Sequence, residues 1–164
     1  MAIKIGDKLP SATLTEMTGN GPQNIAVEDL TKNKRVVIFG LPGAFTPTCS
    51  AKHVPGYVSL ADTLKENKID EIVCVSVNDA YVMGAWAKDQ KAEGKVRMLA
   101  DGSAAFTKAL GLEMDLTAKG MGIRSQRYSM LVDKGVVKAL NVEAPGKFEV
   151  SNAETMAEQV RKLK

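Results

Sequence analysis

Apolar residues in this chain fall into short continuous runs and into stripes with helical spacing. The continuous runs at residues 34–40, 70–77 and 96–100 predict strands that are buried on both faces of a sheet. Stretches with one apolar stripe, or with a residue that can cap a helix, predict helices between and after these strands. These helices are expected over residues 48–66, from Asn78-Asp79 to about Lys91, over 103–110 after Asp101, and from Asn152 to Leu163.

Turn residues divide the rest of the chain. Gly19-Asn20-Gly21-Pro22 interrupts residues 11–27, which therefore predict a short hairpin or a pair of edge strands. Residues 126–132 and 136–142 predict a second hairpin. Its three-residue turn would be Asp133-Lys134-Gly135, in which the glycine suits a positive φ.

The order of these elements predicts an α/β fold with a mixed central sheet. Alternating strands and helices favour parallel strands with right-handed crossovers, and the late hairpin adds antiparallel ones. The thioredoxin-like fold has this order, a βαβ unit followed by ββα, here with an N-terminal strand extension. Gly111–Gly122 is expected to be a loop, and Pro55 is expected to kink the helix over 48–66. The length of 164 residues predicts a single domain over residues 1–164.

Composition narrows the classes of function. The chain is 45% hydrophobic and 25% charged, as soluble globular proteins are, and its net charge is only +3 without a basic block. Nucleic-acid binding is therefore not expected. The sequence contains neither a run of roughly 18 apolar residues, as a membrane span needs, nor the apolar core of a signal peptide at its start. Two cysteines are too few for a disulfide framework, so the cytoplasm is the expected compartment. One histidine and two separated cysteines predict no metal site, and no other cofactor is expected.

The stretch Pro42-Gly43-Ala44-Phe45-Thr46-Pro47-Thr48-Cys49 carries the strongest chemical signal. It follows a buried strand and precedes an amphipathic helix, so Cys49 is expected in the first turn of that helix. Unpaired backbone N–H groups and the positive end of the helix dipole favour an anion there, and the thiolate is the reactive form of cysteine. An average free cysteine is more often an inert core residue. Here two prolines and a glycine build a rigid turn, and Thr46 and Thr48 place hydroxyls near the sulfur. The stretch therefore predicts a nucleophilic cysteine.

Two known patterns of redox-active cysteine can be compared with this stretch. The Cys-x-x-Cys pattern is absent, because the residue three positions past Cys49 is Lys52, so a dithiol–disulfide exchange enzyme is not expected. Pro42-x-x-x-Thr46-x-x-Cys49 instead resembles the active-site signature of the peroxiredoxins, and the longer blocks resemble their type II, or peroxiredoxin-5, subfamily. These blocks run in order along nearly the whole chain: residues 42–50, 53–57, 75–83, 122–129 and 136–143.

The resemblance implies roles for four residues. Cys49 would be the peroxidatic cysteine, which attacks a peroxide oxygen and becomes a sulfenic acid. Thr46 would hold the peroxide by its hydroxyl, and Pro42 would shield the pocket from water. Arg127 would favour the thiolate and polarise the peroxide. A guanidinium suits this last role because it stays charged and can stabilise the negative charge on the departing oxygen.

Arg124 is an alternative to Arg127. If both arginines lay on one strand, a spacing of three would point them to opposite faces, so at most one would reach Cys49. The Arg-Tyr-Ser match favours Arg127, and Arg124 is expected to be a solvated surface charge.

His53 and Cys74 are the remaining candidates. His53 lies four residues after Cys49, on the same face of the predicted helix, where a structural or positioning role is expected. Cys74 lies within an apolar strand, and it is either a buried core thiol or a resolving cysteine that closes a disulfide with Cys49. Some type II relatives have a second cysteine at a similar position. Such a disulfide needs Cα atoms within about 7 Å and would require local unwinding of the helix start.

The expected function is that of a thiol peroxidase for hydrogen peroxide and small alkyl hydroperoxides. The resemblance implies glutaredoxin with glutathione, or thioredoxin, as the reductant, and a homodimer as the assembly. Two alternatives stay open from the sequence. One is a cysteine hydrolase that uses Cys49 and His53, and the other is a redox sensor or holdase that passes oxidation to a partner.

Overall fold

The main sheet is mixed, as the sequence predicts. The computed structural model describes residues 2–163 and contains a seven-stranded sheet in the order β2-β1-β5-β4-β3-β8-β9. The three central strands pair in parallel, and the outer strands pair antiparallel with their neighbours. The strands are β1 (Thr13–Thr18), β2 (Gly21–Ala26), β3 (Arg35–Leu41), β4 (Glu71–Ser76), β5 (Arg97–Ala100), β8 (Tyr128–Asp133) and β9 (Val136–Val142).

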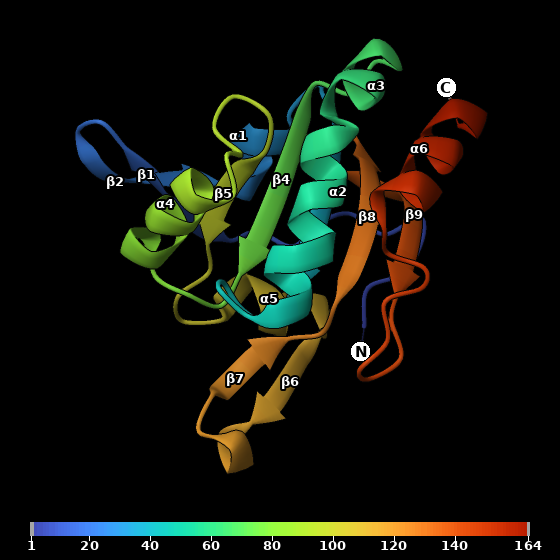
Figure 1. Ribbon diagram of the computed structural model, residues 1–164. Coiled ribbons are helices and arrows are strands. Elements are labelled where there is room, and N and C mark those ends of the chain that lie inside the picture. The colour runs from blue at the N-terminus through green and yellow to red at the C-terminus, as the bar shows by residue number, and fades with distance from the viewer. Residues whose placement is uncertain (1, 164) are drawn as a thin grey trace.

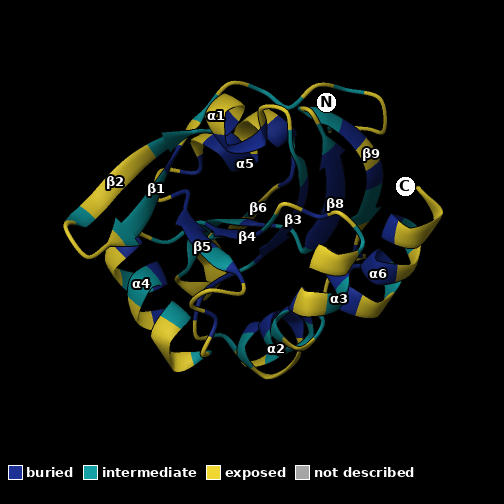
Figure 2. Ribbon diagram, turned by 90° about the horizontal axis from the view of Figure 1, so that it is seen from above, coloured by how far each residue is buried: buried dark blue, intermediate teal, exposed yellow. Residues whose placement is uncertain are grey.

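Helices cover both faces of this sheet (Figures 1 and 2). Successive side chains of a strand point to opposite faces, so Val37 and Phe39 of β3 join one hydrophobic cluster while Val36 and Ile38 join another. Helices α2 (Val54–Ser59), α3 (Ala61–Glu66), α4 (Ala80–Asp89) and α6 (Ala153–Lys162) pack into the first cluster, and α1 (Val27–Thr31) and α5 (Ala105–Leu110) into the second. The thioredoxin-like arrangement is therefore confirmed, with β1 and β2 as its N-terminal extension.

Both predicted hairpins are present, and the second has a tighter turn than expected. β1 pairs with β2 across Gly19 and Asn20, and Pro22 is tolerated because β2 is an edge strand. β8 and β9 are joined by two residues, Lys134 and Gly135, with φ values of 52° and 84°. Positive φ at both positions is the geometry of a two-residue hairpin turn.

The segment Gly111–Gly122, predicted to be a loop, takes part in a third hairpin. Strands β6 (Glu113–Leu116) and β7 (Gly122–Ser125) pair antiparallel around a short 3₁₀ turn, η2 (Thr117–Lys119). Exposed and half-buried residues alternate along β6, a four-residue pattern too short to stand out in the sequence. Figure 1 shows this hairpin extending away from the main sheet.

The predicted helix over 48–66 is divided into three segments. It begins as a π-helix, η1 (Cys49–His53), continues as α2 and breaks at Leu60 before α3. The Val54 N–H donates to the Cys49 carbonyl, five residues earlier. Pro55 follows in the first turn of α2, where it has no N–H to donate and its ring crowds the preceding turn. The wide turn that results contains both Cys49 and His53.

No helix within residues 2–163 is long and apolar enough to cross a membrane.

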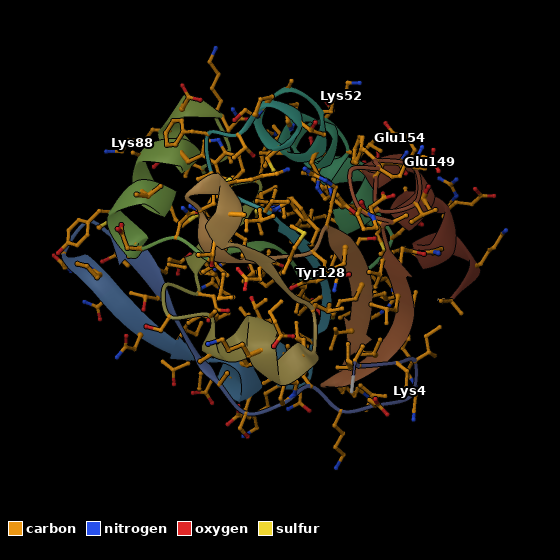
Figure 3. All side chains as sticks on the ribbon, turned by 90° about the horizontal axis from the view of Figure 1, so that it is seen from below. Lys4, Lys52, Lys88, Tyr128, Glu149 and Glu154 are labelled. Atoms are coloured by element: carbon orange, nitrogen blue, oxygen red, sulfur yellow. The ribbon has the colours of Figure 1, made fainter. Side chains whose placement is uncertain are left out.

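A substitution in β3 tests how tightly the centre of the sheet is packed. Gly40 lies opposite Tyr128, whose ring is in the interior of the molecule (Figure 3) and leaves no space for a Cβ atom. Gly40→Ala should lower the free energy of unfolding by about 1–3 kcal/mol, as overpacked cores do. Gly56→Ala in α2 is the matched control, because its Cβ would meet only Ala153 at 3.7 Å, and it should stabilise by about 0.5–1 kcal/mol. Urea denaturation measures both, and equal effects would contradict the prediction.

Candidate active site

Two side chains help to fix the loop after β3 by hydrogen bonds. Thr46 Oγ1 donates to the Gly43 carbonyl at 2.7 Å, and the Ala44 N–H donates to Asn78 Oδ1 at 2.9 Å. Asn78 follows β4, the parallel neighbour of β3, so the ends of two adjacent strands hold the loop between them. This arrangement places Cys49 in the first helical turn, where the sequence predicts it.

The Cys49 sulfur lies against a guanidinium. Arg127 Nη2 donates to Cys49 Sγ at 3.3 Å, although the two residues are 78 positions apart in the chain. Arg127 lies in the two-residue connection between β7 and β8, so the condition that both arginines share a strand is not met. Cys49 is completely buried, and the guanidinium places a permanent positive charge beside its sulfur.

His53 connects the same guanidinium to the segment between β9 and α6. Arg127 Nη1 lies 2.9 Å from His53 Nδ1, and His53 Nε2 lies 3.1 Å from the Ser151 carbonyl. Arginine is only a donor and a carbonyl is only an acceptor, so Nδ1 accepts from Arg127 and Nε2–H donates to Ser151. Burial, followed by the charge of Arg127, lowers the pKa of His53 from 6.5 to about 3. The imidazole is therefore neutral, in one defined tautomer, at neutral pH.

Aromatic rings surround the imidazole. The ring centroids of Phe39, Tyr57 and Phe148 lie 4.9, 5.7 and 5.0 Å from that of His53. Phe148 also faces Arg127, whose Cζ lies 5.8 Å from the ring centroid, within the range of a cation–π contact. The imidazole is completely buried among these rings, which strengthens the electrostatic interactions that it makes.

A small cavity of about 140 Å³ adjoins the site. Pro42, Thr48 and Arg127 line it on one side, and the segment after β9, residues 143–148, lines it on the other. The predicted site residues Pro42 and Arg127 therefore share one cavity. Cys49 itself does not line this cavity, and Arg127 links the cavity to the sulfur.

The expectation that Arg124 is a solvated surface charge is wrong. Its Nη1 donates to the Pro42 carbonyl at 3.1 Å and its Nε donates to the Met121 carbonyl at 3.0 Å. β7 presents Arg124 to the loop that carries Cys49, and the predicted loop at 111–122 gave no indication of this strand. Arg124 thus supports the loop, while Arg127 contacts the sulfur.

Cys74 shares the neighbourhood of Cys49 but differs in its chemistry. It lies on β4 opposite Phe39, is completely buried, and both cysteines are free thiols in this structure. Burial, and then the negative charge of Cys49, raises the pKa of the Cys74 thiol well above its usual value. Within residues 2–163 no group of three or more His, Cys, Asp or Glu residues could hold a metal ion.

Three contributors to the site were missed by sequence reasoning. Phe148 and Ser151 belong to the connection between β9 and α6, and Glu143 begins it. This segment has no periodicity, and its residues approach Arg127 and His53 only in the folded chain. Glu143 lay within a block of family resemblance, which was the only available signal.

Comparisons with known proteins agree with this geometry. The model of the redoxin family matches residues 4–157. Chloroplastic peroxiredoxin-2E of Arabidopsis thaliana is 51% identical over 94% of this chain and 68% of its own length. The crystal structure of reduced Prx3 of Vibrio vulnificus in complex with H₂O₂ is 56% identical, with a TM-score of 0.93 over 96% of this chain and 99% of that one. Peroxiredoxin 5 of Alvinella pompejana is 33% identical, with a TM-score of 0.87 over 98% and 99% of the two chains. The chain therefore belongs to the redoxin family and, within it, to the type II or peroxiredoxin-5-like peroxiredoxins, which are thiol peroxidases.

Proposed function

We propose that Cys49 is the peroxidatic cysteine and that Arg127 activates it and its substrate. The observation that carries this proposal is the 3.3 Å contact between Arg127 Nη2 and Cys49 Sγ in a site shielded from solvent. A guanidinium stabilises a thiolate there, and it can stabilise the charge that develops on an oxygen leaving group.

The proposed reaction has three steps. The Cys49 thiolate attacks one peroxide oxygen, so that an S–O bond forms and the O–O bond breaks. The departing oxygen takes up a proton and leaves as water or an alcohol, and the sulfur becomes a sulfenic acid. A thiol reductant then attacks this sulfur, which forms a disulfide and releases water. A second thiol of the reductant breaks that disulfide and restores Cys49.

Thr46 and Pro42 are proposed to position the substrate. The only proton of the Thr46 hydroxyl is donated to Gly43, so its oxygen is available to accept a hydrogen bond from the peroxide O–H. Pro42 lines the cavity and presents no N–H of its own. A cavity of about 140 Å³ suits hydrogen peroxide and small alkyl hydroperoxides.

His53 is proposed to be a positioning residue. Its only acceptor nitrogen is occupied by Arg127, so it is not available as a general base for Cys49. This occupancy argues against a Cys49–His53 hydrolase. In the proposed role, the neutral imidazole holds one arm of the guanidinium while the other arm points at the sulfur.

We propose that an external thiol regenerates Cys49. The Cys74 thiol stays protonated, and a protonated thiol is a poor nucleophile toward a sulfenic acid. Glutaredoxin with glutathione, or thioredoxin, is the proposed reductant, in a reducing compartment such as the cytoplasm. A homodimer is also proposed, with the face around Phe45 as its contact, because this ring is 53% exposed beside the active-site loop.

The two cysteines should respond differently to substitution by serine. Cys49→Ser should abolish peroxide consumption because the attacking sulfur is lost. Cys74→Ser should retain it with at least one of the two reductant systems, since Cys74 takes no part in peroxide attack. Stopped-flow peroxide assays with each reductant measure both effects, and intact-mass analysis after one equivalent of peroxide should show a gain of one oxygen. Full activity in the Cys49 variant would end the proposal.

Arg127→Lys should slow peroxide reduction by about 10²-fold, the loss typical of one donor to a developing oxyanion. A lysine keeps the charge, but it lacks the planar fork that joins His53 and Cys49. Arg124→Lys is the matched control. It leaves the contact between Arg127 and Cys49 intact, so the rate of peroxide reduction should fall far less. The measurement is the second-order rate constant for hydrogen peroxide, and equal losses in the two variants would count against the assignment.

His53 should make stability depend on pH. Its pKa is about 3 in the folded protein against 6.5 ordinarily, so between these values the unfolded chain binds a proton that the folded chain does not. The contribution of neutral His53 to the free energy of unfolding is complete above pH 6.5. It falls by up to about 1.4 kcal/mol for each unit of pH below that. Urea denaturation between pH 7 and pH 5 measures this slope. Because the chain has one histidine, His53→Gln should flatten it, and an unchanged slope would refute the prediction.

A further inference from the structure

The segment between β9 and α6 is organised by one carboxylate. Glu143 Oε2 accepts from the Val150 N–H at 2.9 Å, the Ser151 N–H at 2.8 Å and the Ser151 hydroxyl at 2.7 Å, and Oε1 accepts from the Glu149 N–H at 2.9 Å. Three consecutive backbone N–H groups thus converge on one anion, as in the concave anion sites called nests. The carboxylate is buried and is part of the chain itself.

The arrangement requires the ionised form of Glu143. Burial alone would raise the pKa of this carboxyl, but the hydrogen bonds from Ser151, Glu149 and Val150 outweigh it and lower the pKa overall. All four groups that face the carboxylate are donors. An ionised carboxylate is the only common side chain of this size that accepts from all of them and donates to none.

Glu143 and Ser151 both form hydrogen bonds with residues of the active site. The Glu143 N–H donates to the Arg127 carbonyl at 2.9 Å, and the Ser151 carbonyl accepts from His53 Nε2 at 3.1 Å and from the Tyr57 hydroxyl at 2.9 Å. Between these anchors, Phe148 lies over the Arg127 guanidinium. A continuous series of hydrogen bonds therefore runs from the Glu143 carboxylate through Ser151, His53 and Arg127 to the Cys49 sulfur.

We propose that Glu143 is a positioning residue that closes the peroxide site. Its carboxylate holds residues 149–151 in place, so that Phe148 covers Arg127 and the Ser151 carbonyl fixes His53. Through His53 it sets the position of the guanidinium on Cys49. The same segment forms one wall of the cavity, so Glu143 also limits the size of the peroxide that fits. The proposal rests on the roles given above to Cys49 and Arg127.

The test compares three variants in a single-turnover experiment without reductant. Glu143→Gln keeps the shape but points an N–H₂ group at N–H donors, and Glu143→Asp keeps the charge but withdraws it by one methylene. Glu154→Gln in α6 is the control. Glu154 is exposed and lies at the periphery of the molecule (Figure 3), and its substitution makes the same change in net charge. The rate of Cys49 oxidation is measured with hydrogen peroxide and with the bulkier cumene hydroperoxide.

Glu143→Gln should slow oxidation by hydrogen peroxide about tenfold, the loss of a charged hydrogen-bond acceptor. Oxidation by cumene hydroperoxide should slow less, because the released segment opens the cavity, so the ratio of the two rates falls. A merely lower fraction of folded protein would reduce both rates equally. Glu143→Asp should show an intermediate ratio, and Glu154→Gln should match the unmodified protein.

An unchanged ratio in both Glu143 variants would overturn the proposal. If Glu143→Gln is not recovered folded, the ratio of the two rates in Glu143→Asp tests the proposal instead. Failure of this inference can be told apart from failure of the peroxidase assignment. If the peroxidase assignment is wrong, Cys49→Ser keeps its activity. If only the role of Glu143 is wrong, Cys49→Ser is inactive and the ratio is unchanged.

Discussion

The contact between Arg127 and Cys49 is the interaction on which the rest of the site depends. A buried sulfur becomes a stable anion only if a positive charge lies beside it, and a guanidinium remains charged under all relevant conditions. Sheet topology brings together two residues that are distant in sequence. β3 and β8 pair antiparallel with Gly40 opposite Tyr128. The loop that follows β3 and the residue that precedes β8 therefore meet at the same end of these two strands. The register of these two strands therefore determines the geometry of the reaction centre.

A neutral histidine is well suited to the second arm of this guanidinium. A carboxylate at the position of His53 would neutralise the charge of Arg127 and repel the Cys49 thiolate. Neutral Nδ1 accepts one N–H without either effect, and the surrounding rings and the Ser151 carbonyl keep it in that form. The cost of burying a charged pair falls when each remaining donor has a partner. The fixed tautomer of His53 thus preserves the full charge of Arg127 for the sulfur and its substrate.

The sequence predicts the parts of this structure that depend on local patterns. Continuous apolar runs locate β3, β4 and β5, and Asn78, Asp79 and Asn152 mark helix starts, because such signals lie within a few residues of the element they define. The rigid turn before Cys49 likewise marks this residue as the proposed nucleophile. The β6–β7 hairpin is too short and too glycine-rich to stand out. Glu143, Phe148 and Ser151 contact the site only through tertiary structure, so no local pattern reveals them.

In the proposed catalytic cycle, closure of the site and regeneration of Cys49 make opposite demands on the protein. Peroxide attack benefits from a dry, fixed centre, whereas an external thiol must reach a sulfur that is completely buried. Oxidation itself reduces this conflict. The thiolate becomes a neutral sulfenic acid, so the charge attraction that holds the sulfur against Arg127 is lost. The sulfur also belongs to a π-helical turn that ends at His53, two residues before Pro55, which lacks an N–H to donate to the preceding turn. In this cycle the closed arrangement is therefore most stable in the reduced enzyme, and oxidation of Cys49 weakens it.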